Sequence, residues 1–165
     1  MKMSEFKNII NQMKITSVPR RLICLWQGKA MDLDNILREI EIHKIDLALI
    51  EKKGDLNEKN TAQQIERYMT YMLKKYESER TEPSALVISN AVLLSRYSCE
   101  MTALLKYGIS PRSMVILVFP KAASKMLPIK AERWIKNNTE SLIERIGLQL
   151  GSPNCVIDDL GAYNE

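Results

Sequence analysis

The sequence predicts a three-layer α/β fold, in which a mainly parallel sheet of four to five strands is covered by helices on both faces. The runs of strand length are continuously apolar rather than alternating, which is typical of strands buried on both faces. A helical segment separates successive runs, as the right-handed crossovers of a parallel sheet require. A chain of 165 residues with 45% apolar and 27% charged residues has the size and composition of one globular domain.

The expected elements follow from hydrophobic periodicity and from turn residues. Ser4 and Asp32 are suited to cap two helices, and Pro19 ends the first of them. The strands are expected at residues 21–26, 45–50, 85–89, 114–119 and, at the edge, 155–160. Further helices are expected at residues 61–80, 95–107 and 129–150, the last of them broken near Asn137 and Asn138.

The domain organisation is expected to be simple. Residues 1–165 form one domain, with an N-terminal helix in residues 1–19 and a core in residues 20–121. Residues 122–165 supply a C-terminal helical region and the edge strand.

Composition excludes several classes of protein. No apolar run reaches the roughly 18 residues that a membrane span needs, so we expect no membrane partner. The three cysteines lie far apart and form no CxxC pair, which favours a reducing, cytoplasmic compartment and argues against a zinc site. His43 is the only histidine and is interpreted as an ordinary residue near a helix end. With one histidine and no GxSxG motif, acyl-transfer chemistry has no candidate residues.

The turn after the first strand, WQGKAMD, contains the main candidate site. Gly28 and Lys29 stand where a phosphate-binding loop would lie, between a strand and a helix. The expected earlier glycine is replaced by Ile23, and Ala30 stands where a Ser or Thr would bind Mg²⁺. A tight turn with a solvated lysine is the simpler interpretation of the same residues.

The third strand lacks the acidic residue that would hold a metal ion. It ends in Ser89 and Asn90, and Asn90 can hydrogen-bond a phosphate but supplies no negative charge. Asp46 and Glu51, at the start and the end of the second predicted strand, are the nearest acidic alternatives. We therefore expect no catalytic residue, no metal site and no ATP hydrolysis by this chain alone, and ATP is the one cofactor left open.

The order of these elements resembles a small AAA-type P-loop domain. More narrowly, the segments ALVISNAVLL and MVILVFPK resemble the BrxF component of BREX phage-exclusion systems, over roughly residues 20–121. In that family a strand ending in an acidic residue precedes a short apolar run, and the following strand ends in an aromatic-proline step such as Phe119-Pro120. The resemblance implies a P-loop-like core and a non-secreted accessory protein that works in a multiprotein complex on DNA.

The charge is unevenly distributed along the chain. Residues 1–30 carry a net charge of +5 and residues 106–136 a net charge of +6, and these segments hold the first and fourth strands. In a P-loop-type sheet these strands are neighbours, so Lys29, Lys121 and Lys125 would form a basic rim for an anionic partner. A set of solvated surface lysines is the simpler interpretation of the same pattern. Any contact with nucleic acid is expected to involve only its backbone.

Three hypotheses remain open. The first is a non-catalytic adaptor with a decayed P-loop fold, bound to a larger protein in a DNA-directed assembly, for which Trp134 is a candidate core residue or partner anchor. The second is a nucleotide-binding ATPase or switch that uses Gly28 and Lys29, with Asp32 or Glu51 as the acidic partner. The third is a small protein that binds nucleic acid through charge alone.

Overall fold

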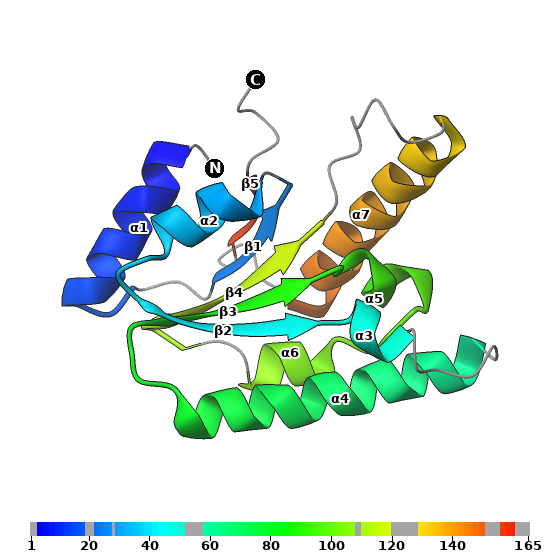
Figure 1. The fold of residues 1–165 in the computed structure, drawn as a ribbon, viewed down its shortest axis with the longest axis horizontal. Helices are drawn as coiled ribbons and strands as arrows, with labels where there is room; N and C mark the ends of the chain where they lie inside the picture. The colour runs from blue at the N-terminus through cyan, green and yellow to red at the C-terminus, as the bar shows by residue number, and fades with distance from the viewer. Residues whose placement is uncertain are drawn as a thin grey trace.

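A five-stranded parallel sheet forms the centre of the computed structural model, which describes residues 3–18, 22–27, 29–51, 58–107, 110–119, 129–150 and 156–160 (Figure 1). Its strand order is β2-β3-β4-β1-β5, and each adjacent pair is parallel. The strands are β1 (Leu22–Trp26), β2 (Glu41–Asp46), β3 (Ser84–Ser89), β4 (Ser113–Val118) and β5 (Val156–Leu160).

Helices cover both faces of this sheet, which confirms the predicted three-layer α/β fold. Two helices lie on one face, α1 (Met3–Ile15) and α2 (Ala30–Ile36). The other face is covered by α4 (Glu58–Glu79), α5 (Val92–Arg96), α6 (Thr102–Tyr107) and α7 (Ile129–Leu150), and the short helix α3 (Ala48–Glu51) follows β2 (Figure 1).

Side chains of each inner strand alternate between the two hydrophobic cores. In β1, Ile23 and Leu25 pack in the core beneath α4 and α7, whereas Cys24 and Trp26 pack beneath α1 and α2. The same alternation gives β4 a fully buried apolar run. For β1, β3 and β4, the interpretation of continuous apolar runs as strands covered on both faces is therefore confirmed.

The position predicted for the second strand is wrong. The sequence analysis placed it at residues 45–50, but β2 spans Glu41–Asp46 and the following apolar residues form α3. Because β2 is an edge strand, one of its sides has no neighbouring strand and most of its side chains reach solvent. An edge strand tolerates polar residues for this reason, so a search for apolar runs passes over it. His43 accordingly lies in a strand rather than at a helix end.

Two helical predictions also change. The helix expected at residues 95–107 is two helices, α5 and α6, separated by a turn in which Ser98 has a positive φ of 49°. In contrast, α7 continues through Asn137 and Asn138, where a break was expected. Thr139 is buried in the middle of this helix, so packing against the rest of the fold outweighs the weak helix propensity of two asparagines.

Within the described part of the chain, no helix is both long and apolar enough to cross a membrane.

Candidate functional site

The predicted ligand edge of the sheet is formed by the carboxyl ends of β1 and β4. These strands are neighbours, and the Phe119 backbone N–H donates to the Trp26 carbonyl just beyond them, with 2.8 Å between N and O. The chain leaves β1 toward α2 on one face and leaves β4 toward α7 on the other. Ligands of parallel α/β sheets bind at the carboxyl ends of strands whose connections diverge in this way.

Lys29 follows β1 at this edge of the sheet, as an exposed residue directly before α2. Its carbonyl accepts hydrogen bonds from the Trp26 indole Nε1–H, at 3.3 Å, and from the Asp32 backbone N–H, at 3.2 Å. The Lys29 side chain does not cap the helix, which is only seven residues long. The turn is thus held by the Lys29 backbone and by Trp26, and this leaves the lysine side chain available to an anion.

Asn90 occupies the end of β3 in an uncommon backbone conformation. Its φ is 58°, in the left-handed region that asparagine adopts more easily than most residues. Its Nδ2 donates to Asp46 Oδ1 at 2.8 Å, and the same carboxylate oxygen accepts the Ala48 backbone N–H at 2.9 Å. The Asn90 side chain therefore joins the ends of β2 and β3.

Asp46 is the functional candidate that the sequence analysis misplaced. It was assigned to the start of the second strand, but it is the last residue of β2 and contributes a carboxylate to the ligand edge. The pattern EIHKID around it mixes apolar and charged residues, as an edge strand does, and this was the signal that could have located it.

The predicted site residues are not all brought together. Because β4 lies between β1 and β3, the strands that precede Lys29 and Asn90 are about 10 Å apart, twice the usual spacing of neighbouring strands. Asp32 is exposed in the first turn of α2, and Glu51 ends α3 with its side chain outside the described residues. Gly28 and the rim lysines Lys121 and Lys125 also lie outside the described residues, as does the side chain of Trp134.

The described residues contain no group of three or more His, Cys, Asp or Glu side chains arranged to hold a metal ion. The Cys99 thiol is buried, and burial, together with the nearby Glu66 carboxylate, raises its pKa to about 12. Since the thiolate is the reactive form of cysteine, Cys99 is an unreactive core residue.

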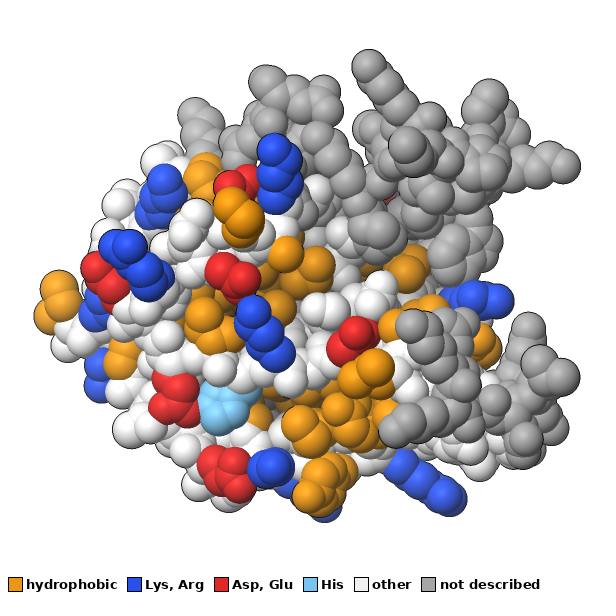
Figure 2. Space-filling view, viewed as in Figure 1, with side chains coloured by type: hydrophobic (Ala, Val, Ile, Leu, Met, Phe, Trp, Pro, Cys, Tyr) orange, Lys and Arg blue, Asp and Glu red, His pale blue; other side chains and the backbone are white. Residues whose placement is uncertain are grey.

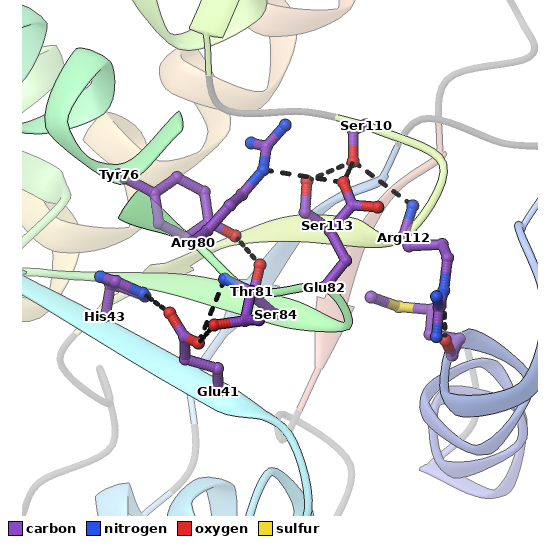
Figure 3. Close-up of polar contacts among 11 residues, drawn as sticks. Glu41, His43, Tyr76, Arg80, Thr81, Glu82, Ser84, Ser110, Arg112 and Ser113 are labelled. Atoms are coloured by element: carbon purple, nitrogen blue, oxygen red, sulfur yellow. Dashed lines mark hydrogen bonds and ion pairs between the residues drawn. The ribbon is translucent and has the colours of Figure 1, made fainter. Parts of the chain in front are cut away.

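A polar cluster occupies the opposite, amino edge of the sheet (Figure 3). At its centre the hydroxyls of Tyr76 and Ser84 share a hydrogen bond of 2.7 Å, and burial raises the pKa of Tyr76. Ser113 Oγ donates to Ser110 Oγ at 2.9 Å, and Ser110 Oγ donates to Glu82 at 2.6 Å. These bonds connect the last turns of α4 to the starts of β3 and β4.

Charged residues surround this centre. Glu41 accepts hydrogen bonds from the backbone N–H and hydroxyl of Thr81 and contacts His43, and these interactions hold the pKa of the Glu41 carboxyl below its ordinary value. The Arg80 guanidinium lies 5.2 Å from the Tyr76 ring centroid and pairs with Glu82 at 3.7 Å, although its buried Nη1 has no hydrogen-bond partner among the described residues.

Arg112 extends the cluster to α1. Its Nε and Nη2 donate to the carbonyls of Met13 and Lys14, each at 3.1 Å, at the carboxyl end of that helix. Arginine is well suited to this position, since its guanidinium has several donors and interacts favourably with a helix C-terminus. The amino-edge cluster therefore connects α1 and α4 with the strands β2, β3 and β4, and its role is structural.

In comparisons with known proteins, no family model matches the chain and no curated protein is similar to it. The function proposed next is accordingly based on the residues and their geometry.

Proposed function

We propose that this protein is a non-catalytic adaptor or accessory subunit with a decayed P-loop fold, serving a DNA-directed multiprotein assembly such as an anti-phage system. The observation that carries the proposal is the chemistry of the carboxyl edge. A lysine follows β1 there, but the next residue is Ala30, which has no hydroxyl for a metal ion. At the end of β3, where a metal-binding acid would stand, the chain has Asn90, whose amide is bound to Asp46.

The proposed loss of catalysis follows from what phosphoryl transfer needs. That chemistry depends mainly on positioning and on neutralising charge with a bound Mg²⁺ ion. Ala30 replaces the hydroxyl ligand and Asn90 replaces the acid, so the two positions that would hold the metal carry residues that do not bind it. The fold itself remains available as a scaffold for protein contacts, which is the role of an adaptor.

A second candidate function is nucleotide binding without hydrolysis, by Gly28 and Lys29. It is favoured by the exposed side chain of Lys29, which lies just beyond the carboxyl end of β1, the strand that pairs with β4. Asp46 also supports this alternative, because its carboxylate lies at the same edge of the sheet.

A thermal-shift experiment separates the two candidates. Adding Mg-ATP at millimolar concentration should leave the melting temperature of the adaptor unchanged, and the same should hold for Lys29→Ala. Nucleotide binding would instead stabilise the wild type by about 2.7 kcal/mol at one hundred times Kd, and Lys29→Ala would abolish the effect. A clear ATP-dependent rise that Lys29→Ala removes would contradict the adaptor proposal.

Partner binding is tested separately. Tagged protein purified from its native cells should bring down a larger protein in a stoichiometric complex. Direct binding of the isolated chain to DNA, steeply weakened by salt, would instead identify a nucleic-acid-binding protein that acts through charge.

A further inference from the structure

A groove between α1 and α2 lies on the face of the molecule remote from α4. It encloses about 290 Å³ and is lined from α1 by Lys7, Ile10, Asn11 and Lys14. Asn35, Ile36, Arg38 and Glu39 line the opposite side, from α2 and the turn that follows it. Figure 2 shows Lys and Arg side chains gathered over these two helices, with acidic side chains between them.

The charges of the groove have a definite arrangement. Lys14 forms an ion pair with Glu39 and also donates to Asn11 Oδ1 at 3.1 Å, and the Lys14 ammonium holds the pKa of Glu39 below its ordinary value. Lys7 and Arg38 are both exposed. With Lys14 and Glu39 neutralising one another, the groove presents two cations to an incoming group.

The floor of the groove is apolar. Ile10 is 2% exposed and Ile36 is half-buried, so an aliphatic side chain between the helices would be in contact with hydrocarbon. The volume lies near the lower end of the range of about 300–1,000 Å³ typical of ligand pockets. It suits a few side chains of a partner better than a whole cofactor.

We propose that this groove binds a short acidic segment of a partner protein, with carboxylates at Lys7 and Arg38 and an aliphatic side chain on Ile10 and Ile36. The asparagine side chains of the groove, Asn11 and Asn35, offer hydrogen bonds that suit a peptide backbone. A nucleic-acid backbone fits less well, because it has no aliphatic group to place on the apolar floor. The inference rests on the proposed adaptor function, for which it supplies the partner surface.

The experiment uses fluorescence anisotropy with a labelled peptide in which Asp and Glu alternate with Leu. The wild-type chain should bind this probe at least about tenfold more tightly than the same peptide with Asn and Gln in place of the acids. Replacing the leucines by serine should also weaken binding, and added salt should weaken it further because the charges are exposed.

The variant Lys7→Glu/Arg38→Glu should lose at least about tenfold in affinity for the probe. Its matched control is Arg67→Glu/Lys75→Glu on α4, which changes the net charge equally at exposed positions outside the groove and should bind as the wild type does. All four residues are exposed, so both variants should keep the wild-type circular dichroism spectrum and melting temperature.

Equal binding of the acidic and neutral peptides, no binding of either, or an equal loss in both variants would overturn the inference. The inference would also be overturned if single-stranded oligothymidine competed with the probe for the wild type and failed to bind the Lys7→Glu/Arg38→Glu variant. That result would assign the groove to nucleic acid. A different result would contradict the adaptor function: the probe binds the groove, but no partner co-purifies with the protein. If a partner co-purifies equally with the wild type and with Lys7→Glu/Arg38→Glu, the adaptor function stands and the groove is not its surface.

Discussion

Asn90 combines a positive φ with a side-chain hydrogen bond, and the two features depend on each other. The left-handed conformation turns the chain sharply after β3, and it directs the Asn90 amide to the carboxylate of Asp46. Asparagine, like aspartate, tolerates this conformation better than most other non-glycine residues. A single residue therefore fixes the geometry of the ligand edge between β2 and β3.

Substitutions at Asn90 should separate these two contributions. Asn90→Ala should destabilise the protein by about 1–3 kcal/mol, because it loses the hydrogen bond and keeps the left-handed strain. Asn90→Gly loses the same bond but relieves the strain, so its loss of stability should be smaller. Urea denaturation of both variants measures the difference, and a glycine variant less stable than the alanine variant would contradict this account.

The contacts of Glu41 predict a dependence of stability on pH. Its pKa lies below the ordinary value of 4.5, chiefly because the Thr81 hydroxyl donates to it and also because His43 contacts it. A carboxyl group with a lowered pKa in the folded state stabilises the protein above the unfolded pKa, and this contribution is lost as the pH falls through the folded value. Glu41→Gln should thus be less stable than the wild type at neutral pH.

The difference in unfolding free energy between Glu41→Gln and the wild type should narrow as the pH is lowered from about 5 to about 3. Chemical denaturation at several pH values measures it. Glu77→Gln is the control, since Glu77 is exposed on α4, and it should follow the wild type throughout. A difference that stays constant with pH would show that Glu41 acts through packing alone.

At the scale of elements, α4 shows how a helix is divided between core and solvent. Its buried stripe contains Ile65, Met69, Leu73 and Tyr76, as its helical periodicity predicts. Tyr71 and Lys74 lie on the outer side, where Tyr71 is 63% exposed. The buried stripe packs against β2, β3 and β4 and is part of the hydrophobic core.

Two substitutions only two residues apart in α4 should differ sharply in effect, because the two side chains lie on different sides of the helix. Leu73→Ala should destabilise the protein by about 2–5 kcal/mol, because Leu73 is fully buried and its removal leaves a cavity against the sheet. Lys75→Ala, at an exposed position, should change stability by less than about 0.5 kcal/mol. Thermal melting of both variants tests the prediction, and similar losses in the two would mean that α4 is not docked through this stripe.

On the scale of the whole molecule, the two edges of the sheet have different chemistry. The amino edge holds the polar cluster of Figure 3, in which most charges have partners within the fold and which joins α1 and α4 to the strands. The carboxyl edge has fewer internal contacts among the described residues and leaves Lys29 exposed. The cluster that joins these elements lies opposite the edge where ligands of parallel sheets bind.

The two faces of the sheet also differ. The proposed partner groove lies on the helices of one face, while the long helices α4 and α7 cover the other face. An adaptor can use helix surfaces in this way without altering the sheet, because neither α1 nor α2 contributes a strand hydrogen bond.

The sequence by itself determined the fold class, the three inner strands β1, β3 and β4, and most helix positions. These elements depend on local periodicity and on burial on both sides, which the order of apolar residues records directly. It also determined that Lys29 follows the first strand, that Ala30 follows Lys29 and that Asn90 follows the third strand, because these are statements about residue identity.

Only the tertiary structure decided which residues meet. It moved the second strand to Glu41–Asp46, since an edge strand carries polar residues that hide it, and it thereby brought Asp46 to Asn90, 44 positions along the chain. It also separated Lys29 from Asn90 by an intervening strand and created the groove between α1 and α2. Strand order and helix docking arise from contacts between residues distant in sequence, and no local pattern of amino acids specifies them.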